Sequence, residues 1–221
     1  MSEIQKRLEA LPFWERLSEE EKAYITAGSG MRTYVRGSVI FNTDSDCLGL
    51  TILVEGEIRA CLISEEGREV TLFRLHDGDC CMLTASCAVS GITFDTQIIA
   101  GSDCRMLVIA PAVLRRLTSE NIWTRCFVYE LAAERFSLVM ATMQDILFKG
   151  FDRRLAKFLV GEYERTGNAV IRMTHEQIAQ YTSSAREVVA RMLKRFSEDG
   201  LLEAKRGEIR LLDIGALKQL I

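Results

Sequence analysis

The sequence has no run of eighteen apolar residues, and its first residues lack the apolar core of a signal peptide. A membrane-spanning helix needs about 20 predominantly apolar residues. The sequence therefore predicts no membrane segment and no secretion. We expect a soluble, cytoplasmic protein that has no membrane partner.

Histidine is scarce, since the chain contains only His76 and His175. A metalloenzyme on a cupin-type barrel needs two or three histidines on neighbouring strands. A glycine-rich phosphate loop and a nucleophile elbow are missing as well. These absences argue against an enzyme, and a cupin-like barrel enzyme stays only as a remote alternative.

The chain as a whole also lacks the excess positive charge that is typical of nucleic-acid-binding proteins, because its formal net charge is −3. The charge is unevenly distributed. Residues 1–149 contain 15 Lys and Arg against 21 Asp and Glu, whereas residues 150–221 contain 13 against 10. This asymmetry makes the C-terminal part the candidate for contact with DNA.

The cysteines number seven, an odd count, and all of them lie in the acidic part of the chain. Without a secretion signal, we expect thiols rather than a disulfide framework.

Two short helices joined by a tight turn are predicted over residues 174–196. Thr174 with Gln177, and Ser184 with Glu187, each have the spacing of a capping box that marks a helix start. Two helices would thus begin ten residues apart, with Ser183 in the turn between them. This spacing is typical of a helix-turn-helix.

The second of these helices has two different faces. Between Val188 and Phe196, apolar side chains recur at helical spacing and predict a packed face. Charged side chains occupy the opposite face. The alternative is an ordinary amphipathic helix pair with a solvated face. The candidate DNA contacts on and around this helix are Thr174, His175, Ser183, Ser184, Arg186, Glu187, Arg191 and Lys194.

Two short alternating runs, 201–204 and 209–212, flank Lys205-Arg206-Gly207-Glu208. Such a pattern predicts a β-hairpin. A hairpin that directly follows a helix-turn-helix is the wing of a winged helix, which favours DNA binding over the plain helix pair.

The C-terminal segment resembles the DNA-binding half of the Crp/Fnr family of bacterial transcription regulators. The resemblance implies double-stranded DNA and RNA polymerase as partners, and base reading by the Arg-Glu-x-x-x-Arg positions. Arg suits guanine and Glu accepts from cytosine N4, which agrees with that role. Ser183 departs from the family at a position that is often Gly. The resemblance is carried by Thr174, Gln177-Ile178, Arg186-Glu187, Arg191 and Leu193-Lys194.

Residues 31–109 consist of short alternating runs with glycine turns at roughly ten-residue spacing. This texture predicts a β-sandwich or jelly-roll barrel. It resembles the family's cyclic-nucleotide-binding-type sensor barrel through Leu53-Val54-Glu55-Gly56, Glu66-Gly67-Arg68-Glu69 and Gly78-Asp79.

A helical stretch that Pro111 opens is predicted to run to about Phe148, with its long part at about 121–148. Apolar residues at alternating spacings of three and four predict a coiled-coil seam and hence a homodimer. The alternative is a single helix with a wide face on its own barrel. The predicted seam contains Tyr129, Ala132, Phe136, Val139, Met143 and Ile146.

The predicted fold is therefore α+β and has three parts: an N-terminal jelly-roll barrel, a long dimerisation helix and a C-terminal winged helix-turn-helix. We expect a sensor domain at 1–148 and a DNA-binding domain at 149–221. The expected function is a sequence-specific DNA-binding transcription regulator that binds a palindromic operator as a homodimer and responds to a signal at the barrel.

The cAMP-binding members of the family hold the ligand with a Gly-Glu step and an Arg-Ser pair. Met82-Leu83 and Phe94-Asp95 stand at the corresponding places here, and apolar Val139 and Met140 replace polar residues of the long helix. A cyclic phosphate needs a cation, which these positions lack. We therefore expect an effector other than cAMP. A cyclic-nucleotide-responsive regulator with non-standard ligand residues is the alternative.

The oxygen-sensing members use an N-terminal cysteine cluster for an iron–sulfur centre, but no cysteine precedes Cys47. Cys80, Cys81 and Cys87 are instead the candidates for a thiol or metal switch. Haem with a cysteine or His76 as axial ligand is a further possibility. The alternative is that these cysteines are small buried hydrophobes, so cofactor and metal stay unknown.

Overall fold

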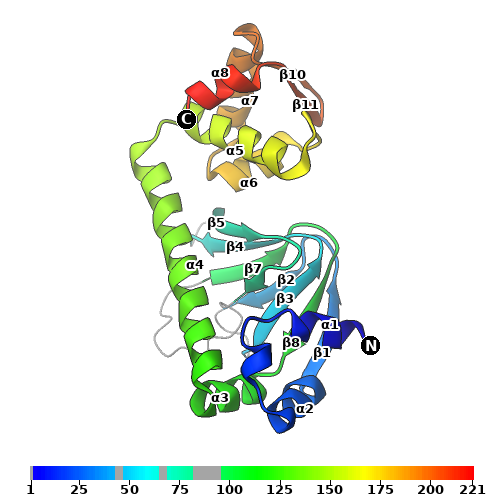
Figure 1. Ribbon diagram of the computed structural model, residues 1–221. Helices are drawn as coiled ribbons and strands as arrows, with labels where there is room; N and C mark the ends of the chain where they lie inside the picture. Colours follow the sequence, from blue (N-terminus) through cyan, green and yellow to red (C-terminus); the bar gives the residue numbers. More distant parts are fainter. Residues whose placement is uncertain (1, 43–46, 65–68, 82–95) are drawn as a thin grey trace. The chain divides into compact units, whose positions relative to one another are not determined.

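The computed structural model of the chain describes residues 2–42, 47–64, 69–81 and 96–221 (Figure 1). Two compact units emerge, one built from 1–63 and 72–140 and the other from 64–71 and 141–221. Within the described residues, no helix is long and apolar enough to cross a membrane.

The first unit contains a β-barrel of two facing sheets. The strand orders are β1-β8-β3-β6 and β2-β7-β4-β5. Side chains of both sheets, such as Phe41, Leu53 and Met106, meet in one buried core. The predicted jelly-roll barrel is thereby confirmed. The strands are β1 (Ser29–Tyr34), β2 (Val39–Asn42), β3 (Leu50–Glu55), β4 (Ile58–Ile63), β5 (Glu69–Leu75), β6 (Cys80–Cys81), β7 (Thr96–Ala100) and β8 (Cys104–Ile109).

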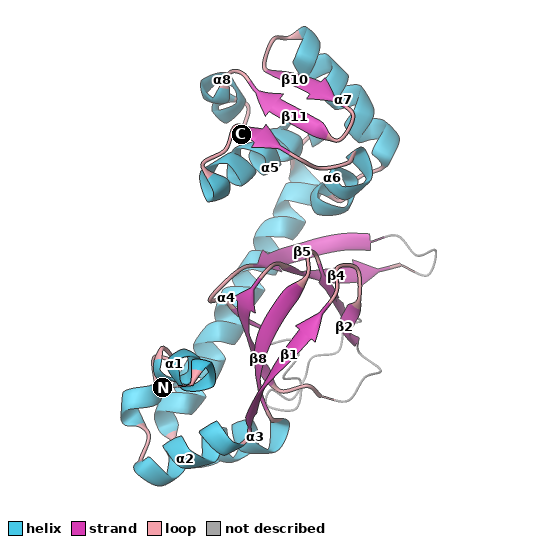
Figure 2. Ribbon diagram, turned by 90° about the vertical axis from the view of Figure 1, so that its right-hand side faces the viewer, coloured by secondary structure: helices cyan, strands magenta, loops and turns pink. Residues whose placement is uncertain are grey.

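Helices cover the outer face of the first sheet (Figure 2). Leu107 and Ile109 of β8 form a second core with apolar residues of these helices, among them Leu114 and Leu131. The sheet is thus buried on both faces, and its central strands are correspondingly rich in apolar residues. The helices are α1 (Glu3–Glu9), α2 (Glu19–Ala27), α3 (Pro111–Glu120) and α4 (Ile122–Phe148), with a 3₁₀ turn at Trp14–Arg16.

The helical stretch that was predicted to start at Pro111 is divided in two at Asn121. This residue has an extended backbone, and its Oδ1 accepts hydrogen bonds from the N–H groups of Trp123 and Thr124 at 3.0 and 3.2 Å. An Asn in this position satisfies the free N–H groups of a helix start. Asn121 thereby ends α3 and begins the long helix α4.

The second unit is a winged helix-turn-helix, as predicted. Its core joins the inner faces of its helices to the wing, for example through Leu155, Val189 and Ile209. The wing strands pair in antiparallel register and are joined through Gly207, whose φ of 78° suits glycine. A two-residue third strand, β9, was not predicted because so short a run has no periodicity. The elements are α5 (Phe151–Thr166), β9 (Val170–Ile171), α6 (His175–Thr182), α7 (Arg186–Glu198), β10 (Leu202–Lys205), β11 (Glu208–Leu211) and α8 (Ile214–Gln219).

Candidate functional site

The first helix of the helix-turn-helix begins where the sequence predicts. Thr174 Oγ1 accepts a hydrogen bond from the Gln177 N–H at 3.2 Å, and Gln177 Oε1 accepts one from the Thr174 N–H at 2.9 Å. This reciprocal capping box fixes the start of α6. It places His175 in the first turn, half-buried beside the exposed Thr174.

The turn into the second helix differs from the prediction. Ser183 has φ 51° and ψ 55°, and the N–H groups of Ser183 and Ser184 both point to the Ala179 carbonyl. Because the Ser184 backbone is used to end α6, α7 starts one residue later than predicted. Its N-cap is Ala185, without a side-chain hydrogen bond. The predicted Ser184–Glu187 capping box is therefore wrong, whereas the predicted Thr174 box is confirmed.

The two faces of α7 agree with the pattern in the sequence. Val189, Leu193 and Phe196 are buried in the core of the second unit. Arg186, Glu187, Arg191 and Lys194 are exposed on the other face. Arg186 and Glu187 occupy the first turn of the helix, the part that contacts base edges when such a helix enters a major groove.

A groove of about 920 Å³ lies between the start of α6, the start of α7 and the wing turn. It brings Thr174, His175 and Arg186 together with Lys205 and Arg206. The sequence analysis placed the last two in the wing but did not count them as DNA contacts. The available signal was the Lys-Arg-Gly turn itself. Glu176 is the only acidic residue among those that line the groove, whereas Arg186, Lys205 and Arg206 are basic. The net charge of the groove therefore favours an anion such as a phosphate.

The long helix exposes an apolar stripe whose phase differs from the predicted seam. Phe136 and Met143, which belong to the seam, are 67% and 45% exposed. Ala132, Val139 and Ile146 are only half-buried rather than exposed, and Val139 packs against the barrel core. Their neighbours one residue along, such as Ala133, Met140 and Leu147, are exposed, because one residue along a helix rotates the side-chain direction by about 100°. The exposed stripe, with spacings of four and three, is Ile122, Cys126, Tyr129, Ala133, Phe136, Met140, Met143 and Leu147.

The cysteine candidates of the barrel are only partly described. Cys81 is buried, and Cys80 lies on β6 with a thiol whose pKa burial raises to about 11, against the opposing influence of Arg135. A thiol in this state is a poor nucleophile at neutral pH. Cys87, like the sensor positions 82, 83, 94 and 95, lies outside the described residues.

The expectation of thiols throughout the chain is wrong at Cys47, which is in a disulfide. The described free thiols are Cys61, Cys80, Cys81, Cys104 and Cys126. Over the ranges that the structure describes, no three His, Cys, Asp or Glu side chains gather in a way that would hold a metal ion.

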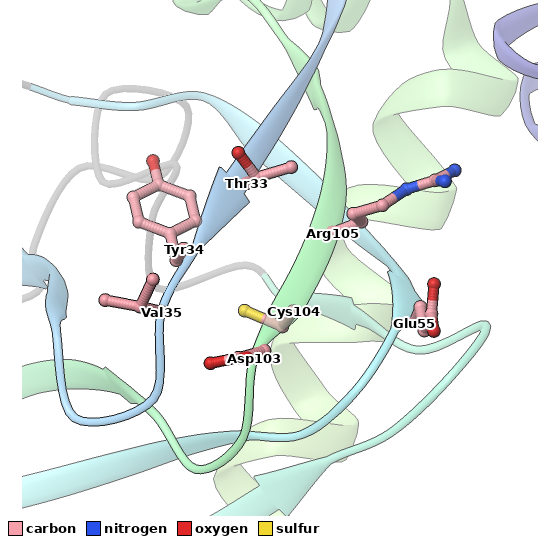
Figure 3. A pocket seen from close by; sticks show the side chains of 7 residues that line it. All are labelled: Thr33, Tyr34, Val35, Glu55, Asp103, Cys104 and Arg105. Carbon is pink, nitrogen blue, oxygen red and sulfur yellow. The ribbon is translucent and has the colours of Figure 1, made fainter.

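A second, smaller pocket of about 290 Å³ lies where β1 and β8 meet (Figure 3). Cys104 lies on the same side of β8 as Tyr34, whereas Arg105 projects from the other side. Arg105 forms an ion pair with Glu3 at 2.5 Å, and Asp103 accepts a hydrogen bond from the Arg36 N–H. Arg105 and Asp103 are thus already paired with other groups of the protein.

These features define a class of protein: a sensor-type barrel joined by a long helix to a winged helix that presents a charged face. Residues 31–121 match the family model of the cyclic nucleotide-binding domain, and residues 153–220 match that of the Crp-like helix-turn-helix domain. The chain therefore belongs to the Crp/Fnr family of transcription regulators.

Individual relatives agree with this assignment. A crystal structure of a Crp/Fnr-family transcriptional regulator from Eubacterium rectale is 36% identical, with a TM-score of 0.89, over 95% of this chain and 97% of that one. The transcriptional regulatory protein btr of Bordetella pertussis is 36% identical over 77 residues, which are 32% of each protein. The cAMP-activated global transcriptional regulator Vfr of Pseudomonas aeruginosa is 22% identical over 79% of this chain and 85% of its own length.

Proposed function

We propose that this protein is a homodimer that recognises a palindromic DNA operator through α7. The exposed trio Arg186, Glu187 and Arg191 carries this proposal. Arg can donate two hydrogen bonds to guanine O6 and N7, and Glu can accept one from cytosine N4. Lys194, further along the helix, is assigned to the phosphate backbone.

The groove beside the wing supplies the remaining backbone contacts in this proposal. Thr174 and His175 at the start of α6 line this groove together with Arg186 of α7. Ser183 and Ser184, in the turn directly before α7, are proposed as further contacts. Lys205 and Arg206 are added from the wing. Contacts to phosphates fix the register of a protein on the duplex, so that base-reading side chains face the correct base pairs.

The proposed dimer forms through the exposed stripe of α4. A single helix-turn-helix reads few base pairs, so useful specificity requires two of them on one operator. The stripe has the spacing of a coiled-coil seam and includes Phe136 and Met140, which are 67% and 42% exposed. In this arrangement, residues 1–148 are the sensor domain and 149–221 the DNA-binding domain. RNA polymerase is the proposed partner of the bound dimer.

The signal that controls the dimer is proposed to act at the barrel and to differ from cAMP. Val139 supports this, because an apolar side chain stands where cAMP-binding relatives offer a polar group to adenine. The second candidate is a cyclic nucleotide held by non-standard residues, which the matched cyclic nucleotide-binding domain favours. We further propose that the protein is not an enzyme.

Selection from a random DNA library tests the central proposal. Full-length protein should enrich a palindrome whose half-sites lie about one helical turn, roughly 34 Å, apart. The double variant Arg186→Ala, Arg191→Ala serves as the control and should enrich no common sequence. Recovery of unrelated sequences by the wild-type protein would contradict specific DNA recognition.

A further inference from the structure

One arginine of the long helix lies against the barrel instead of in solvent. Arg135 donates from its terminal Nη2 to the Cys80 carbonyl at 3.1 Å, and its guanidinium carbon lies 5.7 Å from the centre of the Phe73 ring. Its Nε atom is buried and has no acceptor among the described residues. The side chain is thus oriented by two contacts and keeps an unused donor.

Carboxylates near Arg135 do not neutralise its charge. Throughout the described ranges, Arg135 has no ion pair within 4.0 Å. Asp79 accepts a hydrogen bond from the His76 N–H, and Glu134 is exposed on α4. The thiol of Cys80 cannot serve as a counter-ion, because burial keeps it protonated at neutral pH, with a pKa of about 11.

Another arginine of α4, Arg125, has hydrogen-bond acceptors for its guanidinium and serves as a comparison. Arg125, ten residues earlier on α4, donates from Nε to the Thr118 carbonyl at 2.8 Å and from Nη2 to the Ser119 carbonyl at 2.7 Å. A buried donor without an acceptor is destabilising, and more so when it belongs to a charged group. An anion that pairs with the Arg135 guanidinium and accepts a hydrogen bond from its Nε would therefore remove this destabilisation.

We infer that Arg135 is the anion receptor of the sensor barrel and that its ligand is a small organic carboxylate with an apolar body. The inference rests on the proposed function and names the class of its effector. One guanidinium matches one carboxylate in charge and in hydrogen-bond geometry. The aromatic ring of Phe73 and the half-buried Val139, one turn further along α4, favour an apolar body over a polar base.

The position of Arg135 also connects the ligand to the dimer. Phe136 follows it directly and belongs to the exposed stripe, so one helix carries both the anion receptor and the proposed seam. A ligand that pairs with Arg135 would stabilise one placement of α4 on the barrel. By linkage, it would then favour whichever dimer arrangement uses that placement.

Thermal unfolding of the full-length, dialysed protein tests this inference. The probes are benzoate and its uncharged isostere benzamide at millimolar concentration, with ionic strength held constant by chloride. Benzoate should raise the wild-type Tm by several degrees, because a ligand that binds only the folded state stabilises it. Benzamide should not. Arg135→Gln should abolish the benzoate shift, whereas the matched control Arg115→Gln, an exposed arginine of α3, should retain it.

Three outcomes would overturn the inference: no benzoate shift in the wild type, equal shifts in wild type and Arg135→Gln, or a shift with benzamide. If cAMP shifts the wild-type Tm and Arg135→Gln removes that shift, the ligand is a cyclic nucleotide and the carboxylate assignment is wrong. If Arg135→Gln does not fold, Arg135→Lys takes its place: it keeps the charge but not the two parallel N–H donors, so its benzoate shift should be smaller than that of the wild type, and an equal shift would count against the inference. Operator binding without added acid is measured in parallel, so that failure of DNA recognition is seen separately.

Discussion

The two units expose their functional groups in opposite ways. In the DNA-binding unit, Arg186, Glu187 and Arg191 lie on the solvent side of one helix, within six residues of each other. In the sensor unit, Cys80 and Arg135 meet across 55 residues of sequence, and both are partly or largely buried. A DNA-reading surface must be open to a large rigid partner, whereas a small ligand is enclosed by groups from several elements.

This difference determines how much of each unit can be predicted from the sequence. A helical face is local, so its spacing alone predicts the α7 face, and the hairpin pattern predicts the wing. The contact between Arg135 and the Cys80 carbonyl depends on which residue of α4 faces the barrel. The family resemblance points to positions 82–83, 94–95 and 139–140, and none of these carries a cation, so the sequence does not single out Arg135.

Two features of the helices depend on contacts that spacing does not show. One residue along a helix changes the face by about 100°. In the predicted seam, Val139 is half-buried and packs against the barrel core, whereas its neighbour Met140 is exposed, and the seam itself stays a prediction. The predicted Ser184 cap is wrong, because the Ser184 N–H donates to the Ala179 carbonyl and ends the preceding helix.

The largest expected effect comes from breaking the stripe that pairs the two copies. Phe136→Glu with Met140→Glu should yield a monomer in sedimentation, because four like charges would face one another in the seam. Operator affinity should fall at least 100-fold, since the two half-sites no longer bind together (an estimate of about 10²–10⁴ for linked sites). Ser137→Glu, on the same helix beside the stripe, is the control and should remain a dimer. An unchanged mass of the double variant would contradict the seam.

Base reading gives the next largest effect. Arg186→Ala should cost about 1–3 kcal/mol at one base position and relax the preference there. Lys194→Ala should weaken all sequences alike, because a phosphate contact carries no sequence information. Binding to a set of single-base operator variants measures both. If the two substitutions give the same profile, Arg186 does not read a base.

The wing contributes through charge alone in this scheme. Lys205→Ala and Arg206→Ala should each flatten the salt dependence of DNA binding by about one unit, since each releases about one counter-ion. The control is Lys218→Ala on α8, whose ammonium forms an ion pair with Glu164 at 2.6 Å. Binding titrations at several salt concentrations measure the slope of the logarithm of the binding constant against that of the salt concentration. Unchanged slopes would mean that the wing does not contact the DNA.

The barrel thiols are expected to have little effect on DNA binding. Iodoacetamide at pH 8 should modify Cys80 far more slowly than free cysteine, because the raised pKa of Cys80 keeps its thiolate scarce until the pH approaches 11. Peptide mass spectrometry follows the modification of Cys80. Replacing Cys80 and Cys81 by Ser should leave any redox response of operator binding unchanged. If the substitutions abolished such a response, the hypothesis of a thiol switch at these cysteines would be supported.

The smallest effect tests the turn that joins the two helices of the DNA-binding unit. Ser183 is the one non-glycine residue with positive φ among those the structure describes. A left-handed conformation costs an L-residue about 1 kcal/mol, which glycine avoids. Glycine also gives the unfolded chain more freedom, so Ser183→Gly should stabilise the fold by less than about 1 kcal/mol. Ser184→Gly lacks the relief of strain and should destabilise it. Urea unfolding distinguishes the two, and equal losses in both variants would mean that the Ser183 turn is unstrained.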